Sequence, residues 1–178
     1  MDDHLEHVMR AFSSILIEKQ YPKHHLLHQE GRTCNYLFLV KSGVLRSFYH
    51  KDGKDITAHF VVDHGVITGV DSFIQQKSSR YNIETLEDST VYVLSRYDFD
   101  HFLEEHPEYE RAVRLVVQDI YIDLVERVEN LIFLNAQERY QKLITQNPSI
   151  VQRVSLGHIA TFLGISQETL SRVRSTTI

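Results

Sequence analysis

The C-terminal stretch "SQETLSRVR" (166–174) is rich in side chains that can form hydrogen bonds with the edges of DNA bases. On a helix, residues four apart share a face, so Glu168 and Arg172 point the same way. Arginine donates two hydrogen bonds to guanine O6 and N7, and glutamate accepts one from cytosine N4. We therefore predict that Glu168 reads a cytosine and Arg172 a guanine.

Other residues of this region are expected to contact DNA as well. Ser155, His158 and Ser166 stand near expected helix starts, where phosphates bind, and Arg174 is also expected to contact a phosphate. For any one of these residues taken alone, an ordinary solvated helix face is the competing interpretation. The predicted DNA-contacting residues are Gln167, Glu168, Thr169, Ser171, Arg172, Arg174, Ser155 and Ser166.

Two short helices joined by a three-residue turn are predicted to present these residues. Ser155 and Ser166 are good N-caps, because a serine oxygen accepts a hydrogen bond from a first-turn N–H. Gly164 suits the left-handed end of the first helix, and Ala160 is small enough to let two helix axes approach. The inward positions are all apolar: Ile159, Leu163, Ile165, Leu170 and Val173. This pattern is that of a helix-turn-helix, whose second helix enters a DNA major groove.

The charge of the chain is distributed unevenly. The whole sequence of 178 residues carries −5, with a pI of about 6.1, which argues against nucleic-acid binding by the entire molecule. From residue 135 to residue 178, however, five basic residues accompany two acidic ones, a net charge of +3, so the rest of the chain carries −8. A basic segment on an acidic body indicates that only this segment binds a polyanion.

A continuous helix is predicted over 108–134, because this stretch contains neither proline nor glycine. Its apolar residues step by three and four, as in a coiled coil. The predicted dimer interface consists of Val117, Ile120, Leu124, Val128 and Leu131. Packing against the chain's own strands is the alternative for this seam. A second apolar stripe with Leu115, Ile122 and Val125 indicates two partners for the helix, one within the chain and one across a homodimer.

The N-terminal half is predicted to consist of short strands. Between residues 21 and 95, runs such as "NYLFLVKSG", "VLRSFYH", "VITGVDSFI" and "STVYVLS" are separated by turn signals, including Ser42-Gly43 and Asp52-Gly53. Many short strands with glycine turns favour a sandwich or roll over a parallel sheet. Residues 3–19 are predicted to form one helix, and residues 97–107 a second helix that ends at Pro107.

Other chemistries are less well supported by the sequence. The eleven histidines include no His-x-His pair, which the metal site of a cupin roll needs, and Cys34 is the only cysteine. There is no Gly-x-Ser-x-Gly elbow and no phosphate-binding Gly-x-x-x-x-Gly-Lys loop. We therefore expect no metal, no cofactor and no enzyme activity. No apolar run approaches the roughly 20 residues of a membrane span, and the acidic start lacks a signal-peptide core, so a cytoplasmic location without a membrane partner is expected.

From Gly31 to Arg174 the chain resembles the Crp/Fnr family of bacterial transcription regulators. "YLFLVKSGVLRSFYHKDGKDITAHFVVDHGVI" is similar to the roll strands of the family, and "GISQETLSRVR" to its recognition-helix motif. The resemblance implies an α+β fold with three parts: a sensor domain built as an antiparallel β-roll, or double-stranded β-helix (1–107), a dimerisation helix (108–134) and a helix-turn-helix domain (135–178). It implies a homodimer that binds palindromic double-stranded DNA and, if it activates transcription, contacts RNA polymerase.

The residues expected to form an effector pocket depart from the pattern of the family. Cyclic-nucleotide-binding members open their phosphate cassette with Phe-Gly-Glu and close it with Arg-Ser. Here Val70 replaces the glutamate that grips the ribose, at a cost to cAMP of roughly 1–3 kcal/mol or more, and the closing pair is inverted. We therefore expect an unidentified small-molecule effector, or none, rather than cAMP. The candidate pocket residues are Gly69, Val70, Asp71, Ser72, Ser79 and Arg80.

A further departure concerns the C-terminal end. The family usually follows its recognition helix with a small β-hairpin wing, whereas this sequence stops at Ile178. The wing is therefore expected to be missing, either from this branch of the family or because the sequence is cut short. The competing function is a signalling module, in which the roll senses a ligand and acts through protein contacts while the helix-turn-helix is vestigial.

Overall fold

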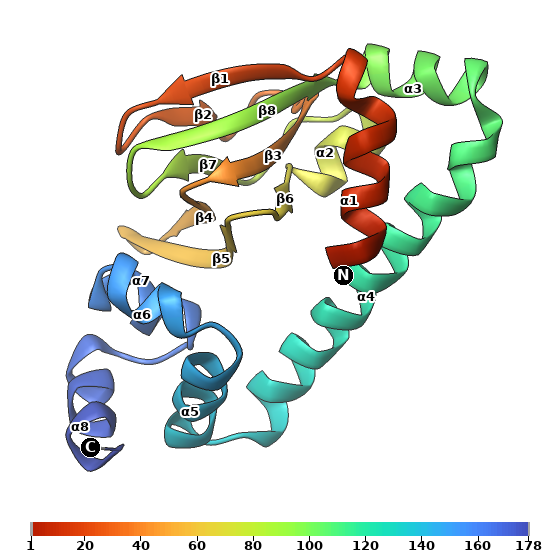
Figure 1. Ribbon diagram of the computed structural model, residues 1–178. Helices are drawn as coiled ribbons and strands as arrows, with labels where there is room; N and C mark the ends of the chain where they lie inside the picture. The colour runs from red at the N-terminus through yellow and green to blue at the C-terminus, as the bar shows by residue number, and fades with distance from the viewer. Residues whose placement is uncertain (1, 178) are drawn as a thin grey trace.

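A computed structural model describes the backbone of residues 2–177 and the side chains of residues 3–175. Figure 1 shows three parts along the chain: a roll of β-strands, the long helix α4, and a group of helices, α5 to α8, that lies beneath the roll. The two ends of α4 are therefore attached to different bodies, the roll at one end and the C-terminal helices at the other.

Two four-stranded antiparallel sheets form the roll. One sheet has the strand order β1-β8-β3-β6 and the other the order β2-β7-β4-β5, so strands from both ends of this region lie side by side. The predicted antiparallel roll is thereby confirmed. The strand bounds are Ile17–Tyr21 (β1), Leu26–His28 (β2), Tyr36–Ser42 (β3), Val44–Lys51 (β4), Lys54–Val62 (β5), Val66–Ile67 (β6), Asn82–Thr85 (β7) and Ser89–Ser95 (β8).

Two of the predicted turns are present and use glycine for different reasons. Gly43 has a φ of +126° and carries the chain from β3 in one sheet to β4 in the other; a Cβ atom there would lie 2.9 Å from the Cα atom of Ser89. Asp52 and Gly53 have φ values of +51° and +72° and close the β4–β5 hairpin, as a two-residue turn with positive φ at both positions requires. Both glycines therefore fix the path of the chain.

Side chains from both sheets fill the interior of the roll. They recur at every second position of a strand, as at Phe38 and Val40 or at Val91 and Val93, because alternate residues point to the same face. The buried cluster contains Cys34, Phe38, Val40, Leu45, Val61, Ile67, Ile83, Val91 and Val93.

Two predicted elements are wrong in part. Helix α1 spans Asp2–Ala11 rather than 3–19, because Ile17–Tyr21 pairs with β8 and gains a full strand ladder there. The predicted strand over 66–74 ends at Ile67, and Val70–Gln75 forms the short helix α2 instead. Ser72 of this helix accepts a hydrogen bond from the Cys34 N–H at 2.8 Å, a tertiary contact that anchors the helix against the roll.

The middle of the chain forms the helices that were predicted. Helix α3 (Arg96–Glu105) begins at Ser95, whose side chain accepts a hydrogen bond from the Asp98 N–H, and it ends before Pro107. A 3₁₀ turn leads into α4 (Glu110–Phe133), close to the predicted bounds of 108–134. Helix α1 packs against the first half of α4, where Val113 and Val116 join an apolar cluster with Leu5 and Phe12.

The last part of the chain contains α5 (Ala136–Gln146), α6 (Pro148–Arg153), α7 (Leu156–Phe162) and α8 (Gln167–Thr177). Their shared core includes Tyr140, Leu143 and Ile150 together with residues of α7 and α8. The same cluster extends into the roll through Val44 and Phe60. The C-terminal helices and the roll are therefore joined by continuous apolar packing.

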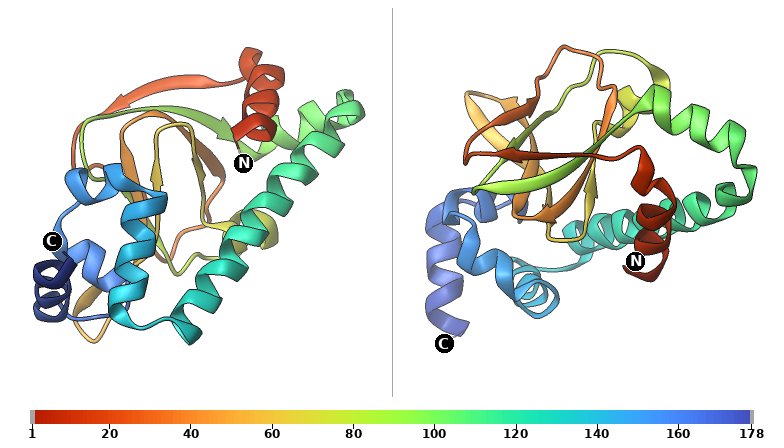
Figure 2. Two further views of the ribbon diagram at one scale, coloured as in Figure 1. Left: turned by 60° about the horizontal axis from the view of Figure 1, so that its bottom comes forward. Right: turned by 45° about the horizontal axis from the view of Figure 1, so that its top comes forward.

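Helix α7 lies along β5, which is the edge strand of its sheet (Figure 2). The outward N–H of Thr57 on this edge donates to Thr161 Oγ at 3.2 Å. The rings of Phe60 and Phe162 pack with their centroids 5.0 Å apart. Covering an exposed strand edge removes a site at which another chain could pair.

Candidate nucleic-acid interface

Helices α7 and α8 form the predicted helix-turn-helix. The Ser155 hydroxyl oxygen accepts a hydrogen bond from the His158 N–H at 3.3 Å, and the Ser166 hydroxyl oxygen accepts one from the Thr169 N–H at 3.2 Å. Gly164 ends the first helix with a φ of +67°. The inward side chains Ile159, Ala160, Leu163 and Leu170 are buried, while Ile165 and Val173 are partly buried against the same cluster. The local sequence signals and the structure agree at every one of these positions.

The outer face of α8 carries the side chains that were predicted to contact bases. Gln167, Glu168, Ser171 and Arg172 are exposed, and Thr169 and Arg174 are partly exposed. Arg172 donates a hydrogen bond to Thr169 Oγ1 at 3.3 Å, a contact at the surface that a base edge can replace. Chemically, this face offers hydrogen-bond donors, hydroxyl groups and one carboxylate, all of which suit base edges and phosphates.

The carboxylate of Glu168 is held in its charged form. A hydrogen bond from the Ser166 hydroxyl is the largest influence that lowers the pKa of Glu168, followed by its own backbone N–H. The positive charges of Lys54 and Arg172 lower this pKa further. Glu168 is therefore an acceptor near neutral pH, as contact with a cytosine amino group requires.

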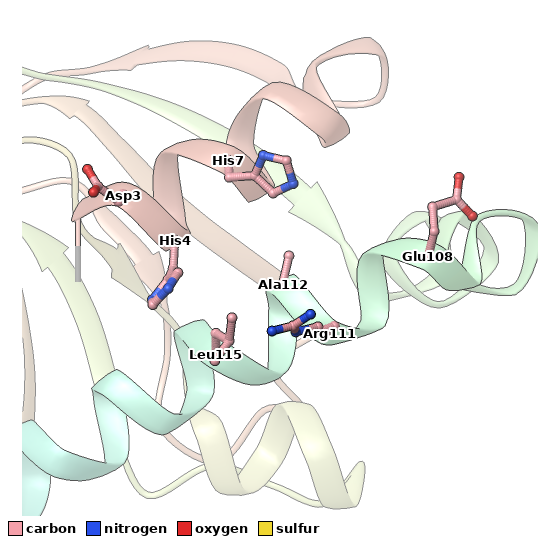
Figure 3. Close-up of a pocket in the computed structure, with 7 residues that line it drawn as sticks. All are labelled: Asp3, His4, His7, Glu108, Arg111, Ala112 and Leu115. Carbon is pink, nitrogen blue, oxygen red and sulfur yellow. The ribbon is translucent and has the colours of Figure 1, made fainter.

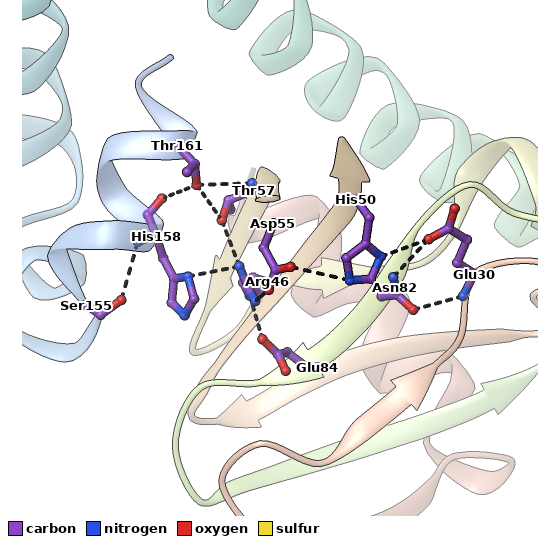
Figure 4. A network of polar contacts seen from close by, with 10 residues as sticks. All are labelled: Glu30, Arg46, His50, Asp55, Thr57, Asn82, Glu84, Ser155, His158 and Thr161. Carbon is purple, nitrogen blue, oxygen red and sulfur yellow. Dashed lines mark hydrogen bonds and ion pairs between the residues drawn. The ribbon is translucent and has the colours of Figure 1, made fainter. Parts of the chain in front are cut away.

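His158 differs from the prediction that it contacts phosphate. Its ring points toward the roll, and the Nδ1 atom lies 2.9 Å from a terminal nitrogen of Arg46 on β4 (Figure 4). The physical reason is that helix α7 begins beside β4 and β5, so its third residue, His158, faces the roll. Ser155 itself remains exposed.

The excess positive charge of residues 135–178 is only partly available at the outer surface. Lys142 pairs with Glu126 of α4 at 2.5 Å, and Arg139 donates to the Leu134 carbonyl oxygen at 2.5 Å. Arg153 pairs with Asp63 and Glu87 of the roll, both at 2.6 Å. Much of the predicted basic surface therefore holds the helices to the acidic body, and the arginines of α8 are the ones that lie on the outer face.

The predicted dimer seam forms an exposed apolar face of α4. The exposed fraction of its five residues ranges from 37% for Ile120 to 57% for Val117. Tyr121, Val125 and Ile132 are also exposed, so the uncovered area is wider than the predicted seam. An exposed apolar face on a helix is typical of an interaction surface.

The residues of the second stripe of α4 lie in two different surroundings. Leu115 lies beside α1 and lines a cleft of about 380 Å³ with His4, His7 and Arg111 (Figure 3). Ile122 and Val125, however, are exposed. The intrachain partner α1 instead packs against Val113 and Val116, because α1 covers only the first half of α4.

The candidate effector-pocket residues surround the start of α2. Val70 is 54% exposed and Arg80 is exposed, whereas Gly69, Ser72 and Ser79 are buried. Both serine hydroxyls form hydrogen bonds within the protein: Ser72 Oγ accepts from the Cys34 N–H at 2.8 Å, and Ser79 Oγ accepts from the Tyr81 N–H at 3.0 Å. Buried Asp71 Oδ1 has no hydrogen-bond partner among the described residues. Both serine hydroxyls of the candidate pocket are therefore engaged within the protein, and the Asp71 oxygen is buried away from solvent.

Cys34 and Arg46 are two buried polar residues near these sites whose roles the sequence analysis did not identify. Cys34 contacts Thr68 at 3.4 Å, and hydrogen bonds with neighbouring groups outweigh burial and lower the pKa of its thiol to about 7. Arg46 is only 2% exposed. Its place in "VLRSFYH" was a usable signal, because alternation puts Arg46 on the same face as Val44 and Phe48, and a buried arginine needs partners.

A comparison of the sequence with known families identifies the roll. The pattern of the family described as "Cyclic nucleotide-binding domain" matches residues 18–106, half of the chain, and the chain belongs to this family. Residues of the chain are also similar to the anaerobic regulatory protein of Bacillus subtilis, with 27% identity over 84 residues. That stretch covers 47% of this chain and only 35% of the curated relative.

Solved structures extend the comparison to the complete fold. The regulator CLP of Xanthomonas campestris, described as responsive to c-di-GMP, superimposes with a TM-score of 0.75 at 15% identity, covering 97% of this chain and 91% of that one. A Crp/Fnr family protein from Eubacterium rectale gives a TM-score of 0.70 at 20% identity, covering 92% and 79% of the two chains. The order of roll, long helix and helix-turn-helix is therefore that of the Crp/Fnr regulators.

Two kinds of feature are absent from the described residues. None of their helices is long and apolar enough to cross a membrane. Nor do three or more histidine, cysteine, aspartate or glutamate side chains gather there as a metal site requires.

Proposed function

We propose that this protein is a Crp/Fnr-type transcription regulator that binds a palindromic DNA operator as a homodimer. The observation that carries the proposal is the outer face of α8, where Glu168 and Arg172 lie exposed within a correctly capped and packed helix-turn-helix. In such a motif the N-terminal part of the second helix enters the major groove. Glu168 then reads a cytosine, Arg172 a guanine, and Arg174 contacts a phosphate.

The dimer supplies the second recognition helix. The exposed face of α4 is apolar over most of its length, and packing it against a second copy removes that surface from water. A two-fold axis along α4 would place the two α8 helices about 34–36 Å apart, one turn of DNA, as palindromic half-sites require. The division of labour is then a sensor domain over 1–107, a dimerisation helix over 108–134 and a DNA-binding domain over 135–178. A regulator that activates transcription would also contact RNA polymerase.

An effector other than cAMP fits the cassette better. Val70 offers an apolar side chain where the ribose hydroxyl needs a carboxylate, and the Ser72 and Ser79 hydroxyls are already engaged within the protein.

Calorimetry tests this view of the cassette. We expect no binding of cAMP at micromolar concentrations. Val70→Glu should strengthen cAMP binding about tenfold or more, since a hydrogen bond to a charged group contributes roughly 1.5–3 kcal/mol. Micromolar or tighter binding by the unchanged protein would contradict the proposal.

Selection of DNA sites tests the central proposal. Random duplex pools are incubated with the full chain, bound duplexes are recovered by mobility shift, and the consensus is expected to be an inverted repeat. Arg172→Ala should weaken binding to the selected site by about 1–3 kcal/mol and relax the preference for one base pair in each half-site. An unchanged consensus and affinity would show that Arg172 does not read a base.

Arg174→Ala is the matched control on the same helix. Loss of a phosphate contact weakens binding to all sequences alike and reduces the salt dependence by about one counterion per half-site. If the two variants behave identically, the assignment of one base contact and one phosphate contact is wrong. If no duplex is retained at low salt, the chain is a signalling module rather than a DNA-binding protein.

A further inference from the structure

Arg46 of β4 contacts side chains from three other elements, β5, β7 and α7, at the boundary between the roll and the C-terminal helices. Its side chain is 2% exposed and lies on β4, with its guanidinium carbon 4.0 Å from the centre of the Phe48 ring. The Nε atom donates to Glu84 on β7 at 2.6 Å, and one terminal nitrogen donates to Asp55 on β5 at 3.0 Å. The other terminal nitrogen donates to Thr57 at 3.2 Å and faces His158 of α7 at 2.9 Å (Figure 4).

The contact with His158 requires a neutral imidazole. All the polar hydrogens of arginine are donors, so Nδ1 of His158 must be the acceptor. A protonated imidazole has N–H groups at both nitrogens and cannot accept. Protonation of His158 would therefore replace a hydrogen bond with two donors that face each other across 2.9 Å.

The same contact lies next to the hydrogen bonds that dock α7. The N–H of Thr57, on the edge of β5 that α7 covers, donates to Thr161 Oγ, one turn after His158. Arg46 donates to the hydroxyl oxygen of the same Thr57. Docking of α7 is thus maintained by one connected set of side chains around the edge of β5. Loss of the Arg46–His158 hydrogen bond would weaken the set where the helix begins.

We infer that Arg46 and His158 form a pH-sensitive latch, which strengthens the docking of the helix-turn-helix domain against the roll near neutral pH and weakens it on mild acidification. The charged groups that face His158 are Arg46 from β4, Glu84 from β7, Asp55 from β5 and His24 from the turn after β1. Both carboxylates are already bound to the Arg46 guanidinium, so neither is free to accept from a protonated His158 without leaving it.

The direction of the effect follows from the surroundings of the ring. Burial, followed by the positive charge of Arg46, lowers the pKa of His158, and these influences exceed the opposite effects of Glu84 and Asp55. An undocked His158 would have an ordinary value near 6.5. The docked state therefore binds fewer protons, so docking is at full strength above about pH 6.5 and weakens as the pH falls below it, at most tenfold per pH unit for one proton.

Hydrogen exchange at the Thr57 amide measures this docking without DNA, so the result is independent of the proposed function. The protection factor, corrected for the intrinsic pH dependence of exchange, is compared in the full chain at pH 7.5 and 5.5. We expect it to fall by about threefold to tenfold. His158→Asn retains an acceptor at the position of Nδ1 but does not titrate, so its protection factor should be the same at both pH values.

Two controls make the outcome specific. His50 belongs to the same network one step away, through Asp55 at 3.3 Å, and His101 is an exposed histidine on α3. His50→Asn and His101→Asn should both keep the loss of protection seen in the unchanged protein. The latch is refuted if the unchanged protein shows no loss, or if His158→Asn loses protection to the same extent.

A measurement on the unchanged protein covers the case in which His158→Asn does not fold. The imidazole proton signals of His158 and the Thr57 amide signal are followed together by NMR from pH 7.5 to 5. Both should move along one titration curve with a midpoint below 6.5. An ordinary midpoint, or a Thr57 signal that does not follow His158, would overturn the proposal.

Discussion

The two helices of the helix-turn-helix lie in opposite surroundings. Polar side chains of α7 face the roll, where His158 and Thr161 meet partners on β4 and β5. Those of α8 face outward, where Arg172 donates to Thr169 of the same helix and Glu168 accepts from the Ser166 hydroxyl. Polar groups fixed across a buried contact determine the position of a domain, whereas polar groups held only locally remain available to another molecule. We therefore propose that α7 positions the domain and that α8 carries the recognition surface.

The arginines show the same contrast. Arg127 lies 3.8 Å from the centre of the Phe162 ring and donates to the Phe162 carbonyl oxygen, and Arg153 pairs with two carboxylates of the roll. Each therefore joins α6 or α7 to another part of the chain. Net charge alone did not distinguish such arginines from Arg172 and Arg174, because it does not show which carboxylates lie nearby.

The largest effect of a substitution is expected on dimer formation through the exposed face of α4. Unlike α7, this face does not pack against the roll. Ile120→Glu combined with Leu124→Glu would place two charges at the centre of the proposed dimer interface, where an unpaired buried charge costs several kcal/mol. We expect only monomers at micromolar concentration in sedimentation velocity. Gln118→Glu, exposed on the same helix outside the seam, should leave the dimer unchanged. A dimer that survives the double substitution would show that the seam lies elsewhere.

An intermediate effect is expected at the clamp between α6 and the roll. Arg153→Met keeps the length of the side chain but leaves Asp63 and Glu87 without their guanidinium partner. Because the three side chains are partly exposed, we expect a loss of about 1 kcal/mol in the free energy of unfolding. Arg174→Met on α8 is the control and should change stability by less than about 0.5 kcal/mol.

The pH dependence of this clamp gives a second measurement. The hydrogen bond with Arg153 is the main cause that lowers the pKa of Asp63. The corresponding stability is therefore present above the ordinary value near 3.9 and is lost as the pH falls through and below it. The stability of Arg153→Met should decline less steeply than that of the unchanged protein between pH 5 and 3. Parallel curves would show that the ion pair does not contribute.

Local signals in the sequence were sufficient to predict the caps and the turn of the helix-turn-helix. Ser155, Gly164 and Ser166 each act on backbone groups within a few residues, so their types alone determine the caps and the turn. The same holds for the Asp52-Gly53 hairpin. The shortened α1 and the helix α2 were missed because pairing of β1 with β8 and the Ser72 contact with Cys34 join residues far apart in the chain.

The candidate site could be predicted on its outer face but not on its inner one. Exposed residues of α8 follow from helical spacing, which the sequence displays directly. The ring of His158 faces Arg46 across 112 positions of sequence, and no local rule connects these two residues. Arg46 itself was recognisable as a buried charge from strand alternation, but its partners on β5, β7 and α7 depend on the packing of three separate elements.

The smallest effect is expected from substitution of the two N-cap serines, which differ in their influence on Glu168. Ser155→Ala and Ser166→Ala should each lower the free energy of unfolding by about 0.5–1 kcal/mol, because each removes one acceptor for a first-turn N–H. Only Ser166→Ala should also raise the pKa of Glu168 toward its ordinary value, since the Ser166 hydroxyl is the main cause of the lowered pKa. An NMR titration of the Glu168 carboxyl measures this shift, and Ser155→Ala is the control with an equivalent cap and no carboxylate beside it. Equal titration curves in the two variants would mean that the Ser166 hydroxyl does not lower the pKa of Glu168. The caps of α7 and α8 would then be equivalent, and the two helices would differ only in what surrounds them.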